Sequence, residues 1–223
     1  MKKSETSVYE ILRNKIITLE YLPGQELNIN SIAADLGVSR SPIRDGLLHL
    51  ELDKLVDIFP QKGTRVSFLN KEIVKQERFM RFNLELGVLK LFLETIKTET
   101  ERKVICTKLK AILMQQHAAI LSGDNKSFLQ QDDNFHHFFY EETKNEWLWN
   151  VMKSQTGNDF RVRLLSYNSR EIIADAEKDH NRILQAIELA DNVLAIEEDK
   201  KHLQKVSLTL ESMYSTFPEH FTS

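Results

Sequence analysis

The chain has 223 residues, 41% of them hydrophobic, and is therefore long enough to bury a core in one large domain or two small ones. Its single cysteine, Cys106, excludes an internal disulfide and a multi-cysteine metal site, and no uncharged apolar stretch is long enough to span a membrane, so we expect a cytoplasmic protein. The net charge is −3, and residues 1–70 hold nine Lys and Arg against nine Asp and Glu, so any binding of nucleic acid must depend on a few locally placed cations.

Short helices are predicted at the start of the chain. Residues 6–19 carry apolar side chains at a helical period, which predicts a first helix. Asn28 is placed to cap a second helix, and Gly37 is placed to end it because glycine adopts positive φ without strain. Ser39 is placed to cap a third helix. The second and third helices are therefore joined by a tight Gly-Val-Ser turn.

After these helices, the sequence pattern predicts first a pair of strands and then helices up to the end of the chain. Val56–Phe59 and Thr64–Phe68 are β-type runs on either side of Pro60–Gly63, which predicts a hairpin and the only β structure of the chain. From Asn70 onward strand signals are absent, and helices are expected over residues 70–96, 98–122, 125–141, 145–167, 171–190 and 192–216. The expected fold is mainly α, with one domain over residues 1–69 and an all-α helical bundle over residues 70–223.

The first domain carries a family resemblance. Residues 22–27, Leu-Pro-Gly-Gln-Glu-Leu, and residues 32–44, Ile-Ala-Ala-Asp-Leu-Gly-Val-Ser-Arg-Ser-Pro-Ile-Arg, resemble the DNA-binding domain of the GntR family of bacterial regulators. The similarity continues through Lys-Gly-Thr-Arg-Val at residues 62–66. It implies a winged helix-turn-helix that binds double-stranded operator DNA. Two departures are Asp45-Gly46, where the family usually has Glu-Ala, and Lys54, where a helix-ending glycine is usual.

The resemblance also indicates which side chains contact DNA. Arg40 and Arg44 are four residues apart at the start of the recognition helix and therefore project from one side, where they can reach guanine edges in the major groove. Hydroxyl and backbone groups of the same helix can meet phosphates, and the wing can approach the minor groove. The predicted DNA-binding residues are Ser39, Arg40, Ser41, Arg44, Lys62, Gly63 and Thr64.

A second constellation lies in the predicted bundle. Asp132 and His136 are four residues apart, so one helical face can direct both at a single ion. Asp-Asp-Asn-Phe-His at residues 132–136, Asp-His at residues 179–180 and Lys-His-Leu at residues 201–203 resemble the FCD effector domain of the FadR branch of the GntR family. The resemblance implies a divalent metal ion held by Asp132, His136, His180 and His202. Three imidazoles and one carboxylate favour a transition metal, with zinc or nickel ahead of manganese or iron.

An effector site would adjoin the metal, because the four ligands leave coordination positions for a small carboxylate. Arg81 matches the Arg-x-x-Leu-Glu of the domain's first helix and can pair with that carboxylate, although a salt bridge to Glu77 or Glu85 on its own helix is equally open. Further candidates to line the site are Asn134, Arg161 and Arg163.

The sequence therefore predicts a ligand-responsive DNA-binding transcription regulator, expected to be a repressor and a homodimer that reads a palindromic operator. Two alternatives stay open. The metal can be purely structural, or the three histidines and the aspartate can form the site of a metalloenzyme.

Overall fold

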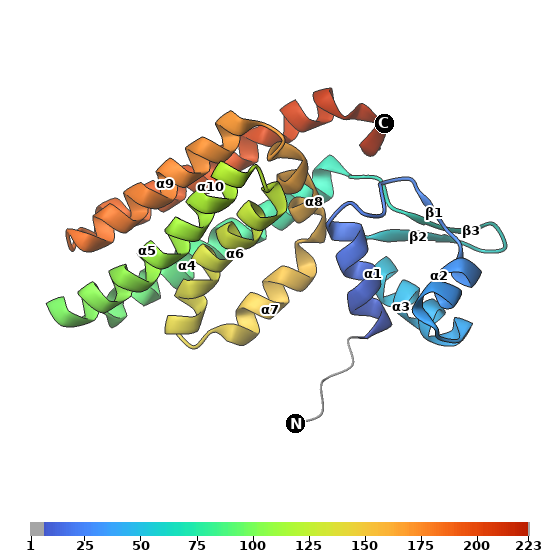
Figure 1. Ribbon diagram of the computed structural model, residues 1–223, viewed down its shortest axis with the longest axis horizontal. Coiled ribbons are helices and arrows are strands. Elements are labelled where there is room, and N and C mark those ends of the chain that lie inside the picture. Colours follow the sequence, from blue (N-terminus) through green and yellow to red (C-terminus); the bar gives the residue numbers. More distant parts are fainter. Residues whose placement is uncertain (1–6, 223) are drawn as a thin grey trace.

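The computed structural model describes residues 7–222, without the side chains of residues 206 and 207, and has two unequal parts (Figure 1). The smaller part contains α1 (Val8–Ile17), β1 (Glu26–Leu27), α2 (Ile29–Leu36), α3 (Arg40–Leu52), β2 (Val56–Phe59) and β3 (Gly63–Val66). The larger part contains α4 (Lys71–Thr95), α5 (Glu99–Ser122), α6 (Asn125–Glu142), α7 (Glu146–Gln155), α8 (Gly157–Ser166), α9 (Arg170–Glu188), α10 (Asn192–Thr216) and a 3-10 turn at Pro218–His220. The predicted fold class, a winged helix-turn-helix followed by an all-α bundle, is confirmed.

The local signals of the smaller part act as predicted. The side chain of Asn28 accepts from the backbone N–H groups of Asn30 and Ser31 and caps α2, and Gly37 ends that helix in the left-handed conformation with φ +65°. Ser39 is the N-cap of α3 but makes no side-chain capping bond. The three strands form an antiparallel sheet in the order β1-β3-β2.

Three predictions on secondary structure need correction. The sheet has a third strand, β1, which was not predicted because two residues are too short to show a period. The first helix ends at Ile17 rather than residue 19, and Thr6, its predicted first residue, lies outside the described residues. The helix predicted over residues 145–167 is two helices, α7 and α8, which meet at Thr156.

The break before α8 has a tertiary cause. A Cβ atom on Gly157 would lie 3.0 Å from Cδ2 of Leu55, which belongs to the core of the smaller part. Such a distance requires a neighbouring atom to shift, so the absence of a side chain lets the start of α8 sit directly against the winged helix. The break thus positions α8 between the two parts of the molecule (Figure 1).

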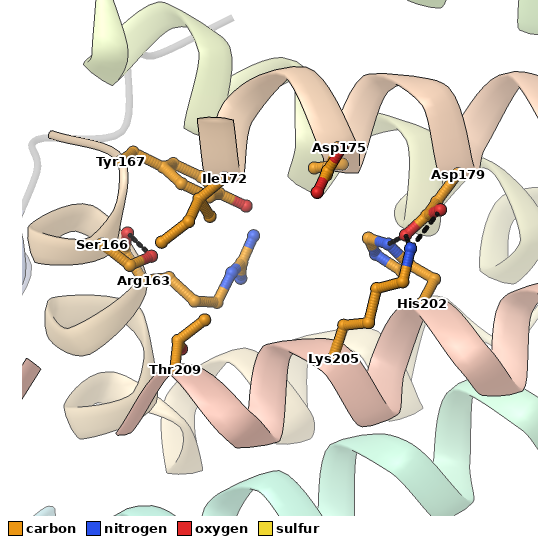
Figure 2. Close-up of a pocket in the computed structure, with 10 residues that line it drawn as sticks. Arg163, Ser166, Tyr167, Ile172, Asp175, Asp179, His202, Lys205 and Thr209 are labelled. Atoms are coloured by element: carbon orange, nitrogen blue, oxygen red, sulfur yellow. Dashed lines mark hydrogen bonds and ion pairs between the residues drawn. The ribbon is translucent and has the colours of Figure 1, made fainter. Parts of the chain in front are cut away.

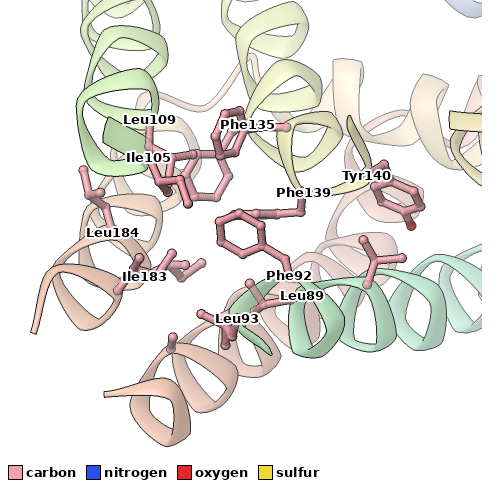
Figure 3. Packing of buried hydrophobic residues seen from close by; sticks show 14 of the residues in the cluster. Leu89, Phe92, Leu93, Ile105, Leu109, Phe135, Phe139, Tyr140, Ile183 and Leu184 are labelled. Carbon is pink, nitrogen blue, oxygen red and sulfur yellow. The ribbon is translucent and has the colours of Figure 1, made fainter. Parts of the chain in front are cut away.

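The bundle is built around an apolar core at the end that lies away from the winged helix (Figure 3). Phe92 of α4 stacks in tilted geometry against Phe139 of α6, with ring centroids 5.0 Å apart, and Ile183 of α9 is fully buried beside them. This core fixes how α4, α6 and α9 face one another. None of the described helices combines the length and the hydropathy needed to span a membrane.

The end of the chain returns to the junction between the two parts. Leu69, fully buried, accepts a hydrogen bond from the backbone N–H of Thr222 at 3.0 Å and donates one to the carbonyl of His220 at 2.8 Å. Arg161 of α8 donates to the carbonyl of Ser67 at 2.9 Å. The segment that joins β3 to α4 is therefore held from both sides, which limits independent movement of the winged helix.

Candidate functional site

The structure brings the four predicted metal ligands together. Asp132 and His136 come from consecutive turns of α6, His180 from α9 and His202 from α10, and all four side chains are buried. One potential ligand atom of each residue lies within 4.8 Å of the others. The Nε2 atoms of His180 and His202 are 3.3 Å apart, and Nε2 of His180 is 3.6 Å from Oδ1 of Asp132. We refer to these four residues as the histidine–aspartate cluster.

Each imidazole is held from behind by an oxygen of another side chain. The Nδ1 atoms lie 3.0 Å from Oε2 of Glu85 for His136, 3.0 Å from Oε1 of Gln116 for His180 and 3.6 Å from Oδ2 of Asp179 for His202. The contact of His180 is a hydrogen bond, and those of His136 and His202 are ion-pair contacts. A proton on each Nδ1 would leave the Nε2 atoms as the metal-binding nitrogens. Metal-binding histidines are commonly oriented in this way by carboxylates or carbonyl groups. Sequence reasoning did not identify these three partners as such, and only Asp179, next to His180, carried a local signal.

The electrostatics hold three of the four groups, His180, His202 and Asp132, in the forms that bind metals, and His136 is the exception. Burial and the neighbouring His202 hold the pKa of His180 well below its ordinary value, and burial lowers the pKa of His202. Burial acts in the same direction on His136, but the Glu85 carboxylate outweighs it and raises the pKa of that imidazole. Burial opposes ionisation of Asp132, yet the adjacent Arg163 holds its pKa far below the ordinary value.

The donor set fits a divalent transition-metal ion. Nε2 of His136 is buried and has no hydrogen-bond partner among the described residues, although a buried imidazole nitrogen without a partner is costly. The close approach of the His180 and His202 Nε2 atoms also brings two lone pairs together. A cation shared by these nitrogens and Oδ1 of Asp132 would satisfy all of them.

A cavity of about 210 Å³ opens beside the cluster (Figure 2). Its lining residues come from α8, α9 and α10: Arg163, Ser166, Tyr167, Ile172, Asp175, Ala176, Asp179, His202, Lys205 and Thr209. In Figure 2 the guanidinium of Arg163 points into the space, while the ammonium of Lys205 reaches Asp179 at 2.8 Å. Nε of Arg163 is buried without a hydrogen-bond partner among the described residues. The cavity therefore has a guanidinium and an ammonium in its lining, both paired with carboxylates, next to the cluster.

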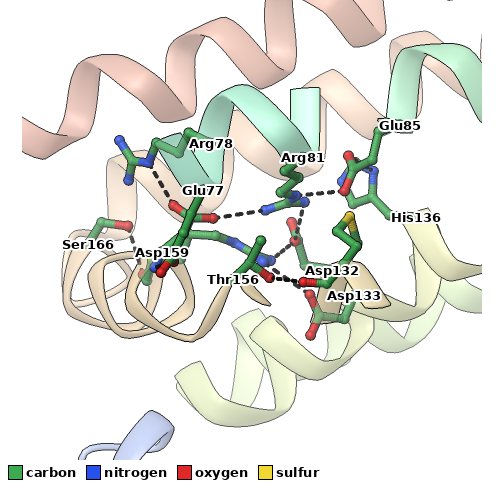
Figure 4. A network of polar contacts seen from close by, with 12 residues as sticks. Glu77, Arg78, Arg81, Glu85, Asp132, Asp133, His136, Thr156, Asp159 and Ser166 are labelled. Carbon is green, nitrogen blue, oxygen red and sulfur yellow. Dashed lines mark hydrogen bonds and ion pairs between the residues drawn. The ribbon is translucent and has the colours of Figure 1, made fainter. Parts of the chain in front are cut away.

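Arg81 does not line this cavity. Its Nε donates to Oε1 of Glu85 at 2.6 Å, and its other nitrogens lie 3.9 Å from Asp132 and 3.7 Å from Asp159 (Figure 4). The structure thus shows the salt bridge on its own helix that the sequence left open. With Glu85 tied to His136, Arg81 helps to orient an imidazole of the cluster.

Asn134 and Arg161 also lie apart from the cavity. Asn134 is half-buried and hydrogen-bonds to Gln130 and Gln131 of its own helix, one face away from Asp132. Arg161 is fully buried at the junction with the winged helix, where its guanidinium donates to the carbonyl of Ser67 and to Oδ1 of Asn158. Two residues further along α8 the side chain emerges on another face, so of the two arginine candidates Arg163 lines the cavity and Arg161 does not.

The predicted DNA-binding residues gather at the outer end of the winged helix. Ser39, Arg40, Ser41 and Arg44 are exposed around the start of α3, and Lys62 and Gly63 are exposed at the tip of the β2-β3 hairpin, which projects away from the bundle (Figure 1). Thr64 is different: only 7% of it is exposed, because it lies in β3 opposite Leu27 and Ile58 with its side chain toward the core. The side chain of Thr64 is therefore covered, and the expected approach of this residue to DNA stays a prediction that would involve its backbone.

An exposed recognition helix with a wing, followed by a helical bundle with a buried cluster beside a cavity, is the arrangement of a helix-turn-helix transcription regulator. The chain belongs to the gntR family of bacterial regulatory proteins: the family model matches residues 5–66, and the model of the FCD domain matches residues 79–205. Because this family consists of transcription regulators, the protein is not an enzyme, and the metalloenzyme alternative is set aside.

Similar proteins agree with this assignment. An uncharacterized HTH-type transcriptional regulator from an unstable DNA locus of Streptomyces ambofaciens is 29% identical over 222 residues, covering 100% of this chain and 91% of that protein. The HTH-type transcriptional repressor RspR of Escherichia coli K12 is 27% identical over 200 residues, covering 90% and 86%. The structure of E. coli McbR/YncC has the same fold, with a TM-score of 0.76 at 18% identity over 93% of this chain and 96% of that one.

Proposed function

We propose that this regulator is a repressor that acts in the cytoplasm and responds to a small carboxylate through a metal ion held by Asp132, His136, His180 and His202. The supporting observation is the convergence of one nitrogen from each of three imidazoles and one carboxylate oxygen in a buried space, with a side-chain oxygen close to Nδ1 of each ring. When bound, a zinc or nickel ion, or a manganese or iron ion, supplies a Lewis-acidic centre with positions left for an anionic ligand. On this proposal residues 1–69 bind DNA and residues 70–223 sense the ligand.

Metal content of the purified protein tests the proposal. We expect about one transition-metal ion per chain in the parent protein and less than roughly a tenth of that in His180→Ala and in His202→Ala. His117→Ala is the matched control, because His117 is exposed and pairs with Glu177 away from the cluster. A parent protein that is metal-free and cannot be reloaded would remove the proposal.

The effector is proposed to bind in the cavity beside His202. The guanidinium of Arg163 and the ammonium of Lys205 supply positive charge there, which favours a carboxylate. Titration calorimetry with citrate, a metal-chelating carboxylate, is expected to show binding to the zinc-loaded protein and roughly tenfold or more weaker binding to the chelator-treated protein. Equal binding, or none to either form across a panel of small acids, would favour the purely structural role of the metal.

A homodimer is proposed because a palindromic operator requires two recognition helices. The outer face of α5 offers a surface for pairing: Val104, Met114 and Leu121 are 53%, 73% and 76% exposed, with exposed Ala111 and Ala118 between them. These residues are separated by seven, three, four and three positions, which is the heptad spacing of a helix-pairing seam.

Sedimentation equilibrium tests this surface. The double variant Met114→Lys with Leu121→Lys is expected to shift the protein from dimer to monomer, because two ammonium groups would have to be buried in the seam. Leu52→Lys, which changes an equally exposed leucine on α3, is expected to stay dimeric. A dimer in both variants would place the interface elsewhere.

A further inference from the structure

Arg163 holds two neighbouring carboxylates at once. One of its terminal nitrogens pairs with Asp132, a member of the histidine–aspartate cluster, and the other donates to Oδ1 of Asp133 at 3.1 Å. All three side chains are buried. Asp132 and Asp133 are consecutive in the chain and lie beside each other in Figure 4. The guanidinium therefore links the cluster and the cavity to a carboxylate that does not belong to the proposed metal site.

The Asp133 carboxylate also contacts a residue of α7. Oδ2 of Asp133 pairs with the ammonium of Lys153, near the end of α7. That ammonium lies 4.5 Å from the ring centre of Phe160 and 5.7 Å from that of Trp149, so two aromatic faces also hold it in place. Only 26% of the Lys153 side chain is exposed. The position of Lys153, and with it the end of α7, depends on the Asp133 carboxylate.

The end of α7 is in turn held by the winged helix. Arg13 of α1 donates from Nη2 to the carbonyl of Lys153 at 2.5 Å and to that of Ser154 at 3.3 Å. These carbonyls belong to the last turn of α7, whose C-terminal groups lack partners within the helix and carry a partial negative charge. A cation from the DNA-binding part therefore caps a helix of the bundle.

The contacts form a continuous path. Ion pairs connect Asp132, Arg163, Asp133 and Lys153, and a hydrogen bond from Arg13 to the backbone carbonyl of Lys153 completes it. A second connection between the two parts, the bond from Arg161 to Ser67, lies on a route to the cluster that includes the longer contact of Arg81 with Asp159 at 3.7 Å. Direct contacts transmit a displacement better than long ones, because packed polar networks have few alternative arrangements.

We propose that this path is the relay by which the winged helix senses the state of the metal and effector site, with Arg163 as the sensing residue and Arg13 as the receiving one. The proposal rests on the proposed function, since it takes the cluster to be a metal site. Asp132 must divide its charge between Arg163 and any cation that the cluster holds, and an anion in the cavity competes with both carboxylates for the same guanidinium. Either event changes how Arg163 pairs with Asp133, and therefore how α7 is held against α1.

Hydrogen exchange of the full-length protein, treated with chelator or loaded with one equivalent of Zn²⁺ alone, tests the relay. In the parent protein, zinc is expected to change amide exchange by about twofold or more both in α9 and α10, where the cluster lies, and in α1. In Lys153→Met and in Arg13→Met the change in α9 and α10 is expected to remain, while the change in α1 is lost. Neither variant alters a cluster or cavity residue.

Matched controls are available in the same bundle. Lys108 pairs with Glu142 beside the ring of Phe138, as Lys153 pairs with Asp133 beside aromatic rings, and Arg102 donates to the carbonyl of Ile187 near the end of α9, as Arg13 does at the end of α7. Lys108→Met and Arg102→Met are expected to keep the full response of α1. Lys153→Arg, which keeps the positive charge, is expected to restore it. Circular dichroism and metal content of each variant separate loss of the relay from loss of the fold.

The outcomes are distinct. Loss of the α1 response in Lys153→Met and Arg13→Met, with its retention in the controls, supports the relay. An α1 response that persists in both variants overturns the relay and leaves the metal site intact. Absence of any zinc-dependent change in α9 and α10 of the parent protein removes the proposed function and the relay with it.

Discussion

The two parts of the molecule place their functional side chains in opposite environments. Around α3 and the wing, the arginines and the lysine proposed to meet DNA are exposed and make no contact that the winged-helix core needs. In the bundle, every residue of the histidine–aspartate cluster is buried, and most are tied to a further buried charge. Fold and function are therefore separable in the first part. In the second they share residues, because a buried charge left without its partner destabilises the protein.

Replacing Arg163 is expected to have the largest effect. Arg163→Met leaves the carboxylates of Asp132 and Asp133 buried with one cationic partner fewer, which should lower the free energy of unfolding by about 3–5 kcal/mol. Urea unfolding of the metal-free protein measures it. Arg182→Met removes an ion pair at 3.0 Å whose arginine is 53% exposed, and should cost less than about 1 kcal/mol. Equal losses of unfolding free energy in Arg163→Met and Arg182→Met would contradict the difference between buried and exposed charges.

Asp199 gives the next largest effect, and one that depends on pH. Burial raises the pKa of this carboxyl from 3.8 to about 7, and its Oδ1 atom has no hydrogen-bond partner among the described residues. The folded state therefore binds the proton more tightly than the unfolded state. Stability from the neutral carboxyl is complete below about pH 4 and is lost as the pH rises through about 7.

Asp199→Asn keeps the shape of the side chain without the charge. At about pH 8 the metal-free variant should be more stable than the parent by on the order of 2–4 kcal/mol, and the difference should disappear as the pH falls toward about 4. Thermal unfolding as a function of pH measures this. Asp175→Asn, at an exposed carboxylate, serves as the control. A stability difference that does not change with pH would mean that packing, rather than ionisation, distinguishes the two side chains.

Arg44 tests the exposed half of the comparison. Arg44→Ala should weaken binding to DNA selected from a random library by about 1–3 kcal/mol and relax the base preference at one position, while unfolding changes by less than about 0.5 kcal/mol. Fluorescence anisotropy at fixed salt measures the binding. Thr64→Ser is the matched comparison: because Thr64 is buried, the variant should bind DNA within about twofold of the parent. A change in unfolding as large as the change in binding would erase the distinction between the two parts.

The sequence predicted the features that depend on local spacing and did not predict those that depend on tertiary packing. Spacing of four residues placed Asp132 and His136 on one face, and local caps such as Asn28 and Gly37 bounded the helices of the winged part. The partners behind the imidazoles were not predictable, since Glu85 and Gln116 lie on helices whose relative placement depends on the whole core. The close approach of Gly157 to Leu55 is equally a tertiary effect, because Leu55 lies in the other part of the molecule.

The smallest expected effect concerns a departure that was visible in the sequence. Lys54, where the family usually has glycine, follows the end of α3 with φ +60°, while Leu55 donates to the carbonyl of Leu50 and completes the helix-ending motif. A left-handed conformation costs a residue with a Cβ about 1 kcal/mol, so Lys54→Gly should stabilise the protein by about that amount. Chemical denaturation measures the gain.

Lys75→Gly, at an exposed position inside α4, is the matched control and should destabilise by about 1 kcal/mol, because glycine there gains no relief from strain. Opposite signs for the two substitutions would show that the conformation at residue 54, and not the loss of a lysine, sets the result. DNA binding should stay within about twofold in Lys54→Gly, since residue 54 lies at the opposite end of α3 from the exposed arginines. The stability of the winged part would then change without any change at its DNA-binding face. In the bundle the two cannot be changed separately, because its functional charges are buried.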